Sequence, residues 1–472
     1  MLRSLVKIPN TRFLATASKS VETTDVLIVG GGPAGLSLAA AIKTSPHLSH
    51  LSTTLIEAGS LTKIRDFYDN PPQNYQNRII SLTNQAKVFL ENKLAIEFLK
   101  DRIQPFDGLY VTDGCSKGTM EMERENMGYM VEIHHIQSAI LKRIKEVSPA
   151  GLDILDSTKV TNIEYSVPGD LLSWPLVTLD NGKYIRTRLL VGADGKNSPV
   201  KNFSGLKSRG WSYNSWGIVA NLKLVYPPFK LRGWQRFLKT GPIALLPMPN
   251  DDAFLTWSTT EPLSRLLLSI DPKATAALIN ASFVLEEVDL KYYYQELEQG
   301  TITTEELIRD IEFRIQQVFD QLADESEIDR CYPPKVADVV GPSRGRFPLS
   351  LAHVDTYIAE RIALIGDAAH TIHPLAGQGL NMGQADCESL VKSLETATQR
   401  GLDIGSKLAL EPYWSERYPL NSALIGGVDK LQKLYSTDFK PIVAVRSFGM
   451  NLVNQMGPLK EFIMDQISGI SK

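Results

Sequence analysis

The chain has 472 residues, 43% of them hydrophobic, so it can bury a large core and form two or three domains. Its formal net charge of -3 and pI of about 6.2 argue against nucleic acid as a partner. The three cysteines, Cys115, Cys331 and Cys387, lie far apart without CxxC or metal-ligand spacing. This pattern indicates a reducing compartment with free thiols, and it predicts no metal site.

The first twenty residues have a composition of their own. Basic residues alternate there with apolar ones, and no acidic residue occurs before Glu22. A basic, acid-free N-terminal segment is typical of a mitochondrial transit peptide, and a disordered tail is the alternative. We therefore exclude residues 1–20 from the fold prediction and expect a mitochondrial protein.

Residues 26–42 form an uncharged run that falls just short of the ~20 residues needed to span a membrane. The run contains four glycines and a proline, which favours a strand at 26–29, a glycine turn and a helix at 34–43. A second short strand is predicted at 53–57. Together these elements form a βαβ unit with parallel strands. Any membrane contact would then be peripheral.

The next 150 residues predict a loop, two helices and three strands. The loop is at 66–77, the amphipathic helices are at 85–100 and 135–146, and the strands are at 159–165, 176–179 and 184–191. Asn181-Gly182 supplies a hairpin turn between the last two strands.

From residue 216 the pattern changes to short strands separated by prolines, which predicts a second, largely antiparallel sheet. Its strands are expected at 217–225, 243–246 and 253–258, and a charged helical stretch follows at 278–322. A buried strand returns at 361–365, followed by a glycine-rich loop, a long helix at 381–398 and further amphipathic helices from 420 onward. One cofactor domain assembled from separated segments, with a second domain inserted, would produce this order.

The first glycine motif runs from Asp25 to Gly35. Gly30 permits a tight turn, Gly32 lets a pyrophosphate approach the backbone, and Gly35 lets the helix pack on the strand. The phosphates would lie at a helix N-terminus, which favours anions. Glu57 ends the next strand, where it can accept hydrogen bonds from ribose hydroxyls and would repel a 2′-phosphate. The motif predicts FAD or NAD rather than NADP.

Two further strands end in glycine and aspartate. The first leads into Asp194 and Gly195, at a sheet edge where ligands bind, although an ordinary Asp-Gly turn would look the same. The second leads into Gly366 and Asp367, which suits a ribityl or ribose hydroxyl. The loop 377–379 then opens a long helix, whose N-terminus could stabilise negative charge on a reduced flavin.

These three motifs, with the run His373-Pro-Leu-Ala-Gly-Gln-Gly-Leu-Asn381-Met-Gly-Gln-Ala-Asp386, resemble the class A flavoprotein monooxygenases. The last run resembles the UbiH-like branch, the ubiquinone-biosynthesis hydroxylases, and the resemblance spans residues 25 to about 465. The segments 107–116 and 231–236 look closer still to fungal mitochondrial members that hydroxylate ring position C5, and the helical stretch 278–322 fits those members better than the bacterial ones.

The resemblance implies a role for each matching residue. The ADP half of FAD would be held by the first motif and Glu57, and Arg78 would lie near the cofactor phosphates. Asp194 and Gly195 would lie between flavin and reductant, and Gly366 and Asp367 would take the pyrophosphate and ribityl. The remaining residues would border the flavin ring and the oxygen site: Pro374, Gly377, Gln378, Gly379, Leu380 and Asn381.

The resemblance also implies the fold and the reaction. The fold is α/β, a Rossmann-like FAD-binding domain assembled from separated segments with an inserted, mostly antiparallel substrate domain. The predicted boundaries are 1–20 transit peptide, 21–205 FAD-binding domain, 206–350 substrate domain with the insertion 278–322, 351–400 return segment and 401–472 C-terminal helices. The reaction is hydroxylation, through a flavin C4a-hydroperoxide, of a polyprenylated hydroxybenzoate or aminobenzoate by O2, and no side-chain acid or base is assigned.

The implied partners are a ferredoxin fed by ferredoxin reductase, a ubiquinone-biosynthesis complex and the matrix face of the inner membrane. The alternatives are another class A flavin hydroxylase or epoxidase that uses NAD(P)H directly, and a non-catalytic prenyl-protein chaperone of the same fold.

Several other clusters favour structural roles. We expect His134-His135 to cap or pack a helix rather than contact flavin. Tyr292–Tyr294 should form a packing or surface cluster, with a partner interface as the alternative. Arg232, Trp234 and Arg236 should lie on a solvated strand edge, and the alternative is that they face substrate or a partner. The spacing of His370 and His373 lacks the partners of a metal site. The apolar C-terminal run 424–470 predicts core packing, and an entrance for a polyprenyl tail or a peripheral membrane face is the alternative.

Overall fold

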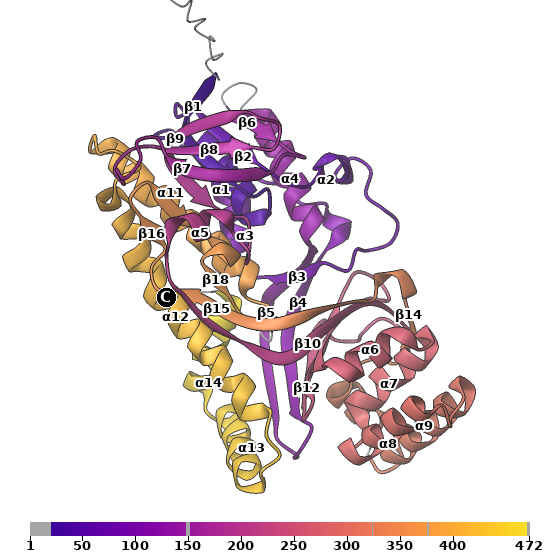
Figure 1. Cartoon of the computed structure of the whole chain (residues 1–472). Helices are drawn as coiled ribbons and strands as arrows, with labels where there is room; N and C mark the ends of the chain where they lie inside the picture. Colours follow the sequence, from indigo (N-terminus) through magenta and orange to yellow (C-terminus); the bar gives the residue numbers. More distant parts are fainter. Residues whose placement is uncertain (1–19, 148–151, 323, 375–376, 470–472) are drawn as a thin grey trace, which may run out of the picture.

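The computed structural model describes residues 20–147, 152–322, 324–374 and 377–469, so nearly all of the predicted transit peptide lies outside the described residues. The fold consists of two sheets with helices packed around them (Figure 1). One sheet is mostly parallel and the other mostly antiparallel, which confirms the predicted fold class.

The first sheet has the central order β16-β17-β9-β1-β2-β6, in which β17, β9, β1, β2 and β6 run parallel. The ribbon β7–β8 extends it antiparallel from the start of β9. Its strands are β1 (Val21–Val29), β2 (Thr53–Ile56), β6 (Leu152–Leu155), β7 (Val160–Tyr165), β8 (Pro175–Leu179), β9 (Tyr184–Gly192), β16 (Ile358–Ala359) and β17 (Ile362–Leu364).

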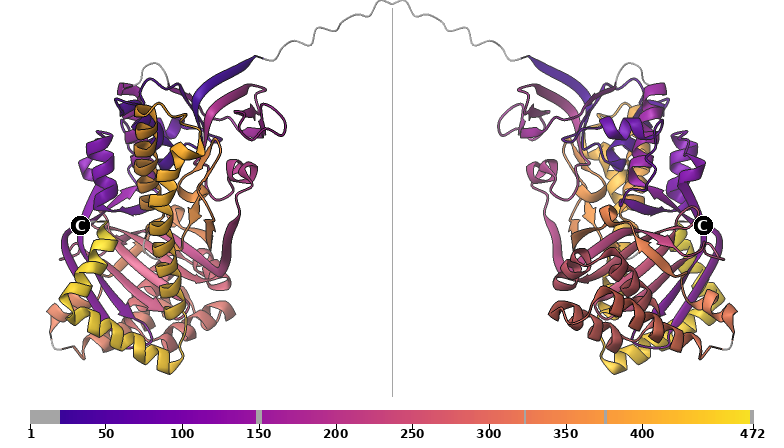
Figure 2. Two further views of the ribbon diagram at one scale, coloured as in Figure 1. Left: turned by 90° about the vertical axis from the view of Figure 1, so that its left-hand side faces the viewer. Right: turned by 90° about the vertical axis from the view of Figure 1, so that its right-hand side faces the viewer.

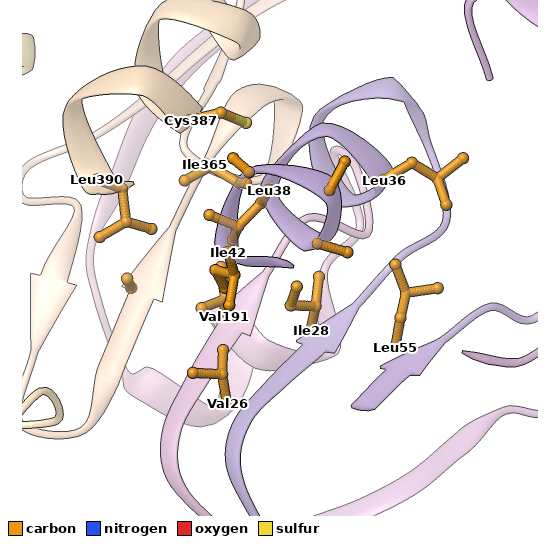
Figure 3. Packing of buried hydrophobic residues seen from close by; sticks show 14 of the residues in the cluster. Val26, Ile28, Leu36, Leu38, Ile42, Leu55, Val191, Ile365, Cys387 and Leu390 are labelled. Atoms are coloured by element: carbon orange, nitrogen blue, oxygen red, sulfur yellow. The ribbon is translucent and has the colours of Figure 1, made fainter. Parts of the chain in front are cut away.

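The main core lies between this sheet and its helices. Figure 3 shows Ile28 and Val191 of the sheet together with Leu38 of α1 and Leu390 of α11, all fully buried. Parallel strands covered by helices are buried, which explains why residues 26–29 read as a continuous apolar run. The helices around this sheet are α1 (Pro33–Thr44), α2 (Thr62–Phe67), α3 (Asn84–Val88), α4 (Ile133–Val147), α5 (Pro199–Ser204) and α11 (Gly379–Gln399).

The second sheet has the order β18-β15-β10-β13-β12-β11-β4-β5-β3, and β14 pairs with β10 beside it. All its pairs are antiparallel except β11–β4. Its strands are β3 (Ile79–Leu82), β4 (Ile103–Asp113), β5 (Thr119–Glu132), β10 (Ser208–Leu224), β11 (Gly233–Leu238), β12 (Gly241–Pro247), β13 (Asp252–Thr260), β14 (Val336–Val339), β15 (Gly345–Val354) and β18 (His370–Thr371).

Two groups of helices flank the second sheet on different sides of the molecule (Figures 1 and 2). The inserted group packs on β10–β13 and confirms the helical stretch expected at 278–322. This group is α6 (Glu261–Ser269), α7 (Pro272–Val284), α8 (Glu287–Gln299), α9 (Thr304–Phe319) and α10 (Glu325–Cys331). The C-terminal group is α12 (Lys407–Tyr435), α13 (Lys440–Gln455) and α14 (Gly457–Ser468).

The helix predicted at 85–100 is wrong in its second half. The chain follows α3 with a π-helical turn at Phe89–Lys93, and Ala95 then takes a left-handed backbone with φ of 54°. This kink lets Leu94 and Ile96 both enter the core, where they are 1% and 3% exposed. Tertiary packing therefore overrides helix propensity at this point.

Two long strands that the sequence pattern did not predict, β4 and β5, lie in the second sheet. β4 pairs with β11 on one side and with β5 on the other, and β3 pairs antiparallel with β5 at the edge of the sheet. The strands β3, β4 and β5 thus belong to the second sheet, whereas α3 and the turn that follows it pack on the core of the first sheet. The predicted domain boundaries stay predictions.

Core packing was the wrong prediction for much of the C-terminal run. Phe439, Val445, Phe448 and Phe462 of the α13–α14 region are 62%, 71%, 69% and 59% exposed. Within the described residues, no helix is both long and apolar enough to cross a bilayer.

Candidate active site

Three distant segments meet at the carboxyl end of the first sheet. Val29 at the end of β1 lies opposite Gly192 of β9, and Gly192 lies opposite Leu364 of β17. Backbone hydrogen bonds continue past the strand ends, from Ala193 N–H to the Val29 carbonyl at 2.8 Å and from Ile365 N–H to the Gly192 carbonyl at 3.0 Å. All three glycine motifs therefore begin at one edge, where ligands bind in such sheets.

The first motif forms a tight turn that opens onto the N-terminus of α1. Gly30 has φ of +113°, and a Cβ there would lie 2.3 Å from the Ala193 carbonyl oxygen. A Cβ on Gly35 would lie 1.9 Å from the Gly30 carbonyl oxygen, so any larger residue would force strand and helix apart. In contrast, nothing lies within 4 Å of a Cβ built on Gly32, the N-cap of α1. This open approach to unpaired helix N–H groups fits a pyrophosphate.

Glu57 holds the glycine turn in place. Its carboxylate accepts hydrogen bonds from the Gly31 and Gly59 N–H groups, both at 2.6 Å. A carboxylate has about four lone-pair sites, so capacity remains for ribose hydroxyls. Glu57 thus has a structural role that the sequence did not predict, and its binding of ribose hydroxyls stays a prediction.

Asp194 lies at the end of the second segment with both carboxylate oxygens buried and no hydrogen-bond partner among the described residues. Burial raises its pKa to about 6. The next residue, Gly195, has φ of +82° and open space around it. A buried polar group without a partner costs about 1–3 kcal/mol, so a ligand hydroxyl that donates to Asp194 would be strongly favoured. This fits the sugar or ribityl hydroxyls of a flavin dinucleotide.

The third segment packs directly against the first. A Cβ built on Gly366 would lie 3.4 Å from the Ala34 Cβ of α1, and one built on Gly379 would lie 3.9 Å from Asp367 Oδ1. Asp367 is accessible to solvent, yet the surrounding protein desolvates it and raises its pKa, which the charges of His370 and Arg78 partly offset. Arg78 is therefore close to Asp367, as a shared cofactor site requires.

The loop that leads into α11 from Gly377 is held by contacts with other elements. Asn381 donates to the Ser81 carbonyl at 2.9 Å and accepts from Thr83 N–H at 3.0 Å. Its amide is thus already engaged in joining α11 to β3 and α3. Gln378 donates to the Ile467 carbonyl of α14 at 3.3 Å, which connects this loop to the C-terminal helix.

The other predicted loop residues fall into two groups. Gly377 has φ of +61° and lies against Ser81, and Leu380 packs half-buried on the main core. Residues 375 and 376 lie outside the described residues, so they add nothing to this geometry.

A buried charge network behind this loop was missed by sequence reasoning. Asp386 of α11 accepts a hydrogen bond from Gly366 N–H at 3.0 Å and lies 2.6 Å from His370 Nε2. Arg417 and Asn421 of α12 donate to its other oxygen at 3.2 and 3.0 Å. Burial alone would raise the Asp386 pKa, but these partners lower it below its ordinary value. The only signal in the sequence was the position of Asp386, two turns into the glycine-initiated helix.

A small cavity adjoins the loop on the face of the second sheet. Pro374 and Pro242 border it together with Gln235, Ala244, Thr256 and Ser258. Gln235, Ala244 and Thr256 lie directly opposite one another on β11, β12 and β13. This polar and apolar row lies beside Pro374.

The histidine and tyrosine clusters singled out in the sequence have structural roles. His135 is buried and accepts from Leu99 N–H at 2.9 Å, as expected for packing. Tyr293 is buried and donates to Asp310 at 2.6 Å, whereas Tyr292 is 41% exposed, so the tyrosine cluster lies partly in the core and partly at the surface.

The predicted solvated edge at Arg232, Trp234 and Arg236 is wrong, because β11 is an inner strand and the three residues are 2%, 3% and 9% exposed. Arg232 is buried and forms an ion pair at 2.6 Å with the half-buried Glu121.

His370 and His373 have different surroundings. His370 bonds Asp386, whereas the His373 ring lies edge-on to Tyr213 with centroids 5.0 Å apart. Among the described residues no group of three or more His, Cys, Asp or Glu side chains could hold a metal.

Comparisons with known proteins agree with this geometry. A family model described as "FAD binding domain" matches residues 329–426. The chain is 57% identical over 465 residues to "Ubiquinone biosynthesis monooxygenase COQ6, mitochondrial" of Saccharomyces cerevisiae, which covers 98% of this chain and 97% of the relative. The human protein of that name is 34% identical over 447 residues, covering 93% of this chain and 91% of the relative.

Solved structures of lower identity support the fold. PqsL, "a probable FAD-dependent monooxygenase from Pseudomonas aeruginosa", matches with a TM-score of 0.62 at 19% identity, covering 90% of this chain and all of that one. The p-nitrophenol 4-monooxygenase PnpA from Pseudomonas putida matches with a TM-score of 0.63 at 14% identity, covering 96% of this chain and all of that one.

Proposed function

Because this chain belongs to the COQ6 family of mitochondrial ubiquinone-biosynthesis monooxygenases, we propose that it hydroxylates ring position C5 of a polyprenylated hydroxybenzoate or aminobenzoate. It is an FAD-dependent monooxygenase that acts on the ring of a ubiquinone precursor. The end-to-end similarity to the yeast relative carries this conclusion, and it excludes the prenyl-protein chaperone. The choice of C5 is supported by the resemblance of segments 107–116 and 231–236 to fungal enzymes of that specificity.

The residues of the three motifs fit FAD. Gly30, Gly32 and Gly35 would bind its pyrophosphate at the α1 N-terminus, and Glu57 would take the ribose. Asp194 and Asp367 would accept hydrogen bonds from hydroxyls of the cofactor, and Arg78 would balance phosphate charge. When bound, FAD supplies the activation of O2 and the transfer of one oxygen atom to the ring.

The protein itself would position the cofactor and the substrate ring and exclude water from the site. Asp386 holds Gly366 N–H and His370, and so keeps the Gly366–Asp367 turn in one geometry. The α11 N-terminus at Gly379 favours negative charge by up to ~2 kcal/mol when partly buried. The row Gln235, Ala244 and Thr256 would orient the ring beside Pro374.

The reductant is proposed to be a ferredoxin fed by ferredoxin reductase. Direct reduction by NAD(P)H is the competing possibility. Stopped-flow mixing of the FAD-loaded protein with NADPH under argon should bleach the flavin only slowly, and rapid bleaching would favour the nicotinamide.

The protein is mitochondrial, as its relatives are named. We place it at the matrix face of the inner membrane, in a ubiquinone-biosynthesis complex. The exposed apolar side chains of α13 and α14 support a peripheral contact. The hydrogen bond from Gln378 to the Ile467 carbonyl places the end of α14 beside the start of α11, which would border the flavin. A prenylated substrate could then enter from the lipid.

Deletion of the gene tests the assignment most directly. Mass spectrometry of the deletion strain should show a prenylated ring precursor that lacks oxygen at C5. Accumulation of a precursor already oxygenated at C5 would contradict the proposed position.

A further inference from the structure

One side of α12 packs against the body of the protein along much of the helix. In Figure 1, α12 extends from beside α11 down to α13. Residues four positions apart lie on the same side of a helix. Five residues with this spacing are all buried: Tyr413, Arg417, Asn421, Ile425 and Asp429. Four of the five are polar or charged, or carry a hydroxyl, so this side of α12 can form specific contacts as well as apolar packing.

The two ends of this buried side contact elements of the candidate site. The Tyr413 hydroxyl donates to the Leu364 carbonyl, at the end of β17, at 2.7 Å. Asp429 accepts a hydrogen bond from the Tyr213 hydroxyl at 3.0 Å, and the Tyr213 ring lies edge-on to His373. The helix therefore lies behind both the strand that leads into the third glycine segment and the loop that follows this segment.

Between these two contacts, Asp386 joins the ends of the turn that carries Asp367. One carboxylate oxygen, Oδ2, accepts a hydrogen bond from Gly366 N–H at 3.0 Å and lies 2.6 Å from His370 Nε2. Gly366 and His370 lie on either side of Asp367 in the sequence. A displacement of this one carboxylate would therefore release both ends of the turn and move Asp367.

The other oxygen of Asp386, Oδ1, accepts hydrogen bonds from α12. Arg417 Nε donates to it at 3.2 Å and Asn421 Nδ2 donates at 3.0 Å. Arg417 also donates to the side-chain carbonyl of Asn421 at 2.7 Å, so the three side chains form a closed ring of hydrogen bonds. The side chains of Arg417 and Asp386 are 11% and 0% exposed. Because arginine keeps its charge in proteins, Arg417 gives the buried carboxylate a permanent cationic partner.

We infer that Arg417 is a positioning residue for FAD, which acts through Asp386 on the turn that carries Asp367. Arg417 orients the carboxylate, the carboxylate fixes both ends of the turn, and the turn presents Asp367 to a hydroxyl of the cofactor. The inference rests on the proposed function, in which Asp367 binds FAD. It gives α12 a part in cofactor retention, although none of the three glycine motifs lies on this helix.

The test is a double-mutant cycle that measures the dissociation constant of FAD, at a temperature at which every variant is folded. Arg417→Met should weaken FAD binding about 10-fold, because Asp367 is no longer held in place for its hydrogen bond. In the Asp367→Ala background the same change should weaken binding little further, since the contact that Arg417 supports is already absent. Two residues that acted independently would instead give additive losses.

Matched variants separate positioning from stability. Arg446→Met breaks another buried arginine–aspartate pair, with Asp113, between α13 and the second sheet. It should lower the melting temperature of the FAD-free protein about as much as Arg417→Met does, yet leave the dissociation constant of FAD unchanged. Arg417→Lys keeps a cation beside Asp386 and should retain most of the affinity. If Arg417→Met does not fold, Asn421→Ala replaces it in the cycle, with an expected loss of about 2- to 10-fold.

Unchanged FAD binding by Arg417→Met would overturn the inference, and so would full additivity with Asp367→Ala. Equal weakening by Arg446→Met would also overturn it, since loss of FAD would then follow from lowered stability alone. If Asp367→Ala itself binds FAD normally, the proposed role of Asp367 fails, and the route from Arg417 to the cofactor fails with it. FAD binding is measured without the ring precursor, so the result is independent of which ring position the protein hydroxylates.

Discussion

Asp194 opposes stability in the FAD-free protein, because its carboxylate is buried and the cost of desolvation outweighs the favourable effect of the Ser198 side chain and nearby backbone groups. Its folded pKa of about 6 lies above the value near 3.9 of an unfolded aspartate. Folding therefore favours the protonated form. Below about pH 4 the carboxyl is protonated in both the folded and the unfolded chain, so it does not lower the free energy of unfolding. That free energy falls as the pH rises from about 4 through 6, where the folded carboxyl ionises.

We predict that Asp194→Asn stabilises the FAD-free protein by about 2–3 kcal/mol at neutral pH and by much less near pH 4. The same change should weaken FAD binding, since an amide oxygen is a poorer acceptor for hydroxyls than a carboxylate. Urea unfolding at the two pH values measures the first effect, and flavin titration measures the second.

Asp180→Asn, an exposed position at the β8–β9 turn, serves as the control and should change neither quantity. A stability gain of Asp194→Asn that is equal at both pH values would contradict the titration argument.

Asp367 is expected to contribute to cofactor binding alone. It is solvent-accessible and caps no helix of more than one turn, so Asp367→Ala should leave the melting temperature of the FAD-free protein nearly unchanged. Loss of one charge-assisted hydrogen bond should weaken FAD binding at least about 10-fold. Purification with bound flavin at the unmodified stoichiometry would refute this role. Asp170→Ala, at an exposed loop, is the matched control.

Among the elements, α13 is attached to the second sheet by one buried ion pair. Arg446 donates twice to Asp113 at the end of β4, at 2.8 Å each, and both side chains are fully buried. Arg446 also donates to the carbonyls of Leu434 and Thr437, which fixes the α12–α13 turn.

Arg446→Met should destabilise the protein by about 3–5 kcal/mol, because the buried Asp113 carboxylate loses its cationic partner and keeps only the hydrogen bonds from Cys115 N–H and the Ser116 hydroxyl. Guanidinium unfolding measures this loss. The double variant Asp113→Asn/Arg446→Met should recover part of it. Lys183→Met, which breaks an exposed pair with Glu22, should cost less than about 1 kcal/mol. Similar losses for the two single variants would contradict the role of burial.

Local signals predicted the elements that they could determine. The glycine spacing from Gly30 to Gly35 specified the β1–α1–β2 unit, because close strand–helix packing admits no other residue there. The kink at Ala95 and the inner position of β11 could not be predicted, because distant partners cause them. Within the site, the glycine and aspartate positions could be predicted from the sequence. The hydrogen bond from Gly366 N–H to Asp386 could not, because it joins residues 20 positions apart.

Across the whole molecule, exposed apolar side chains are concentrated along α13 and the start of α14. Val445, Phe448 and Leu452 lie on the face of α13 opposite the buried Arg446 and Met450, and α13 contains no acidic residue. A surface helix ordinarily carries charge on its outer face. This face therefore suits the interfacial region of a bilayer, in agreement with the proposed location.

Val445→Asp/Phe448→Asp should reduce binding to vesicles of inner-membrane lipid composition at least about 10-fold, because each buried side chain contributes about 1.5–3 kcal/mol. Co-sedimentation with vesicles measures it. Val288→Asp/Phe313→Asp changes a similarly exposed pair on the helical insertion, 69% and 61% exposed, and should bind vesicles normally. Equal loss in both variants, or in neither, would exclude α13 as the contact.

The register that joins Val29, Gly192 and Leu364 also constrains how the protein is made. The pocket wall is complete only when residues more than 330 positions apart have met, so its contact order is high and assembly is slow. A nascent or newly imported chain cannot retain the nucleotide until its last third has emerged. The yellow colour of bound flavin in a purified sample would thus show that all three segments have folded together. Translation products truncated before Leu364 would be colourless.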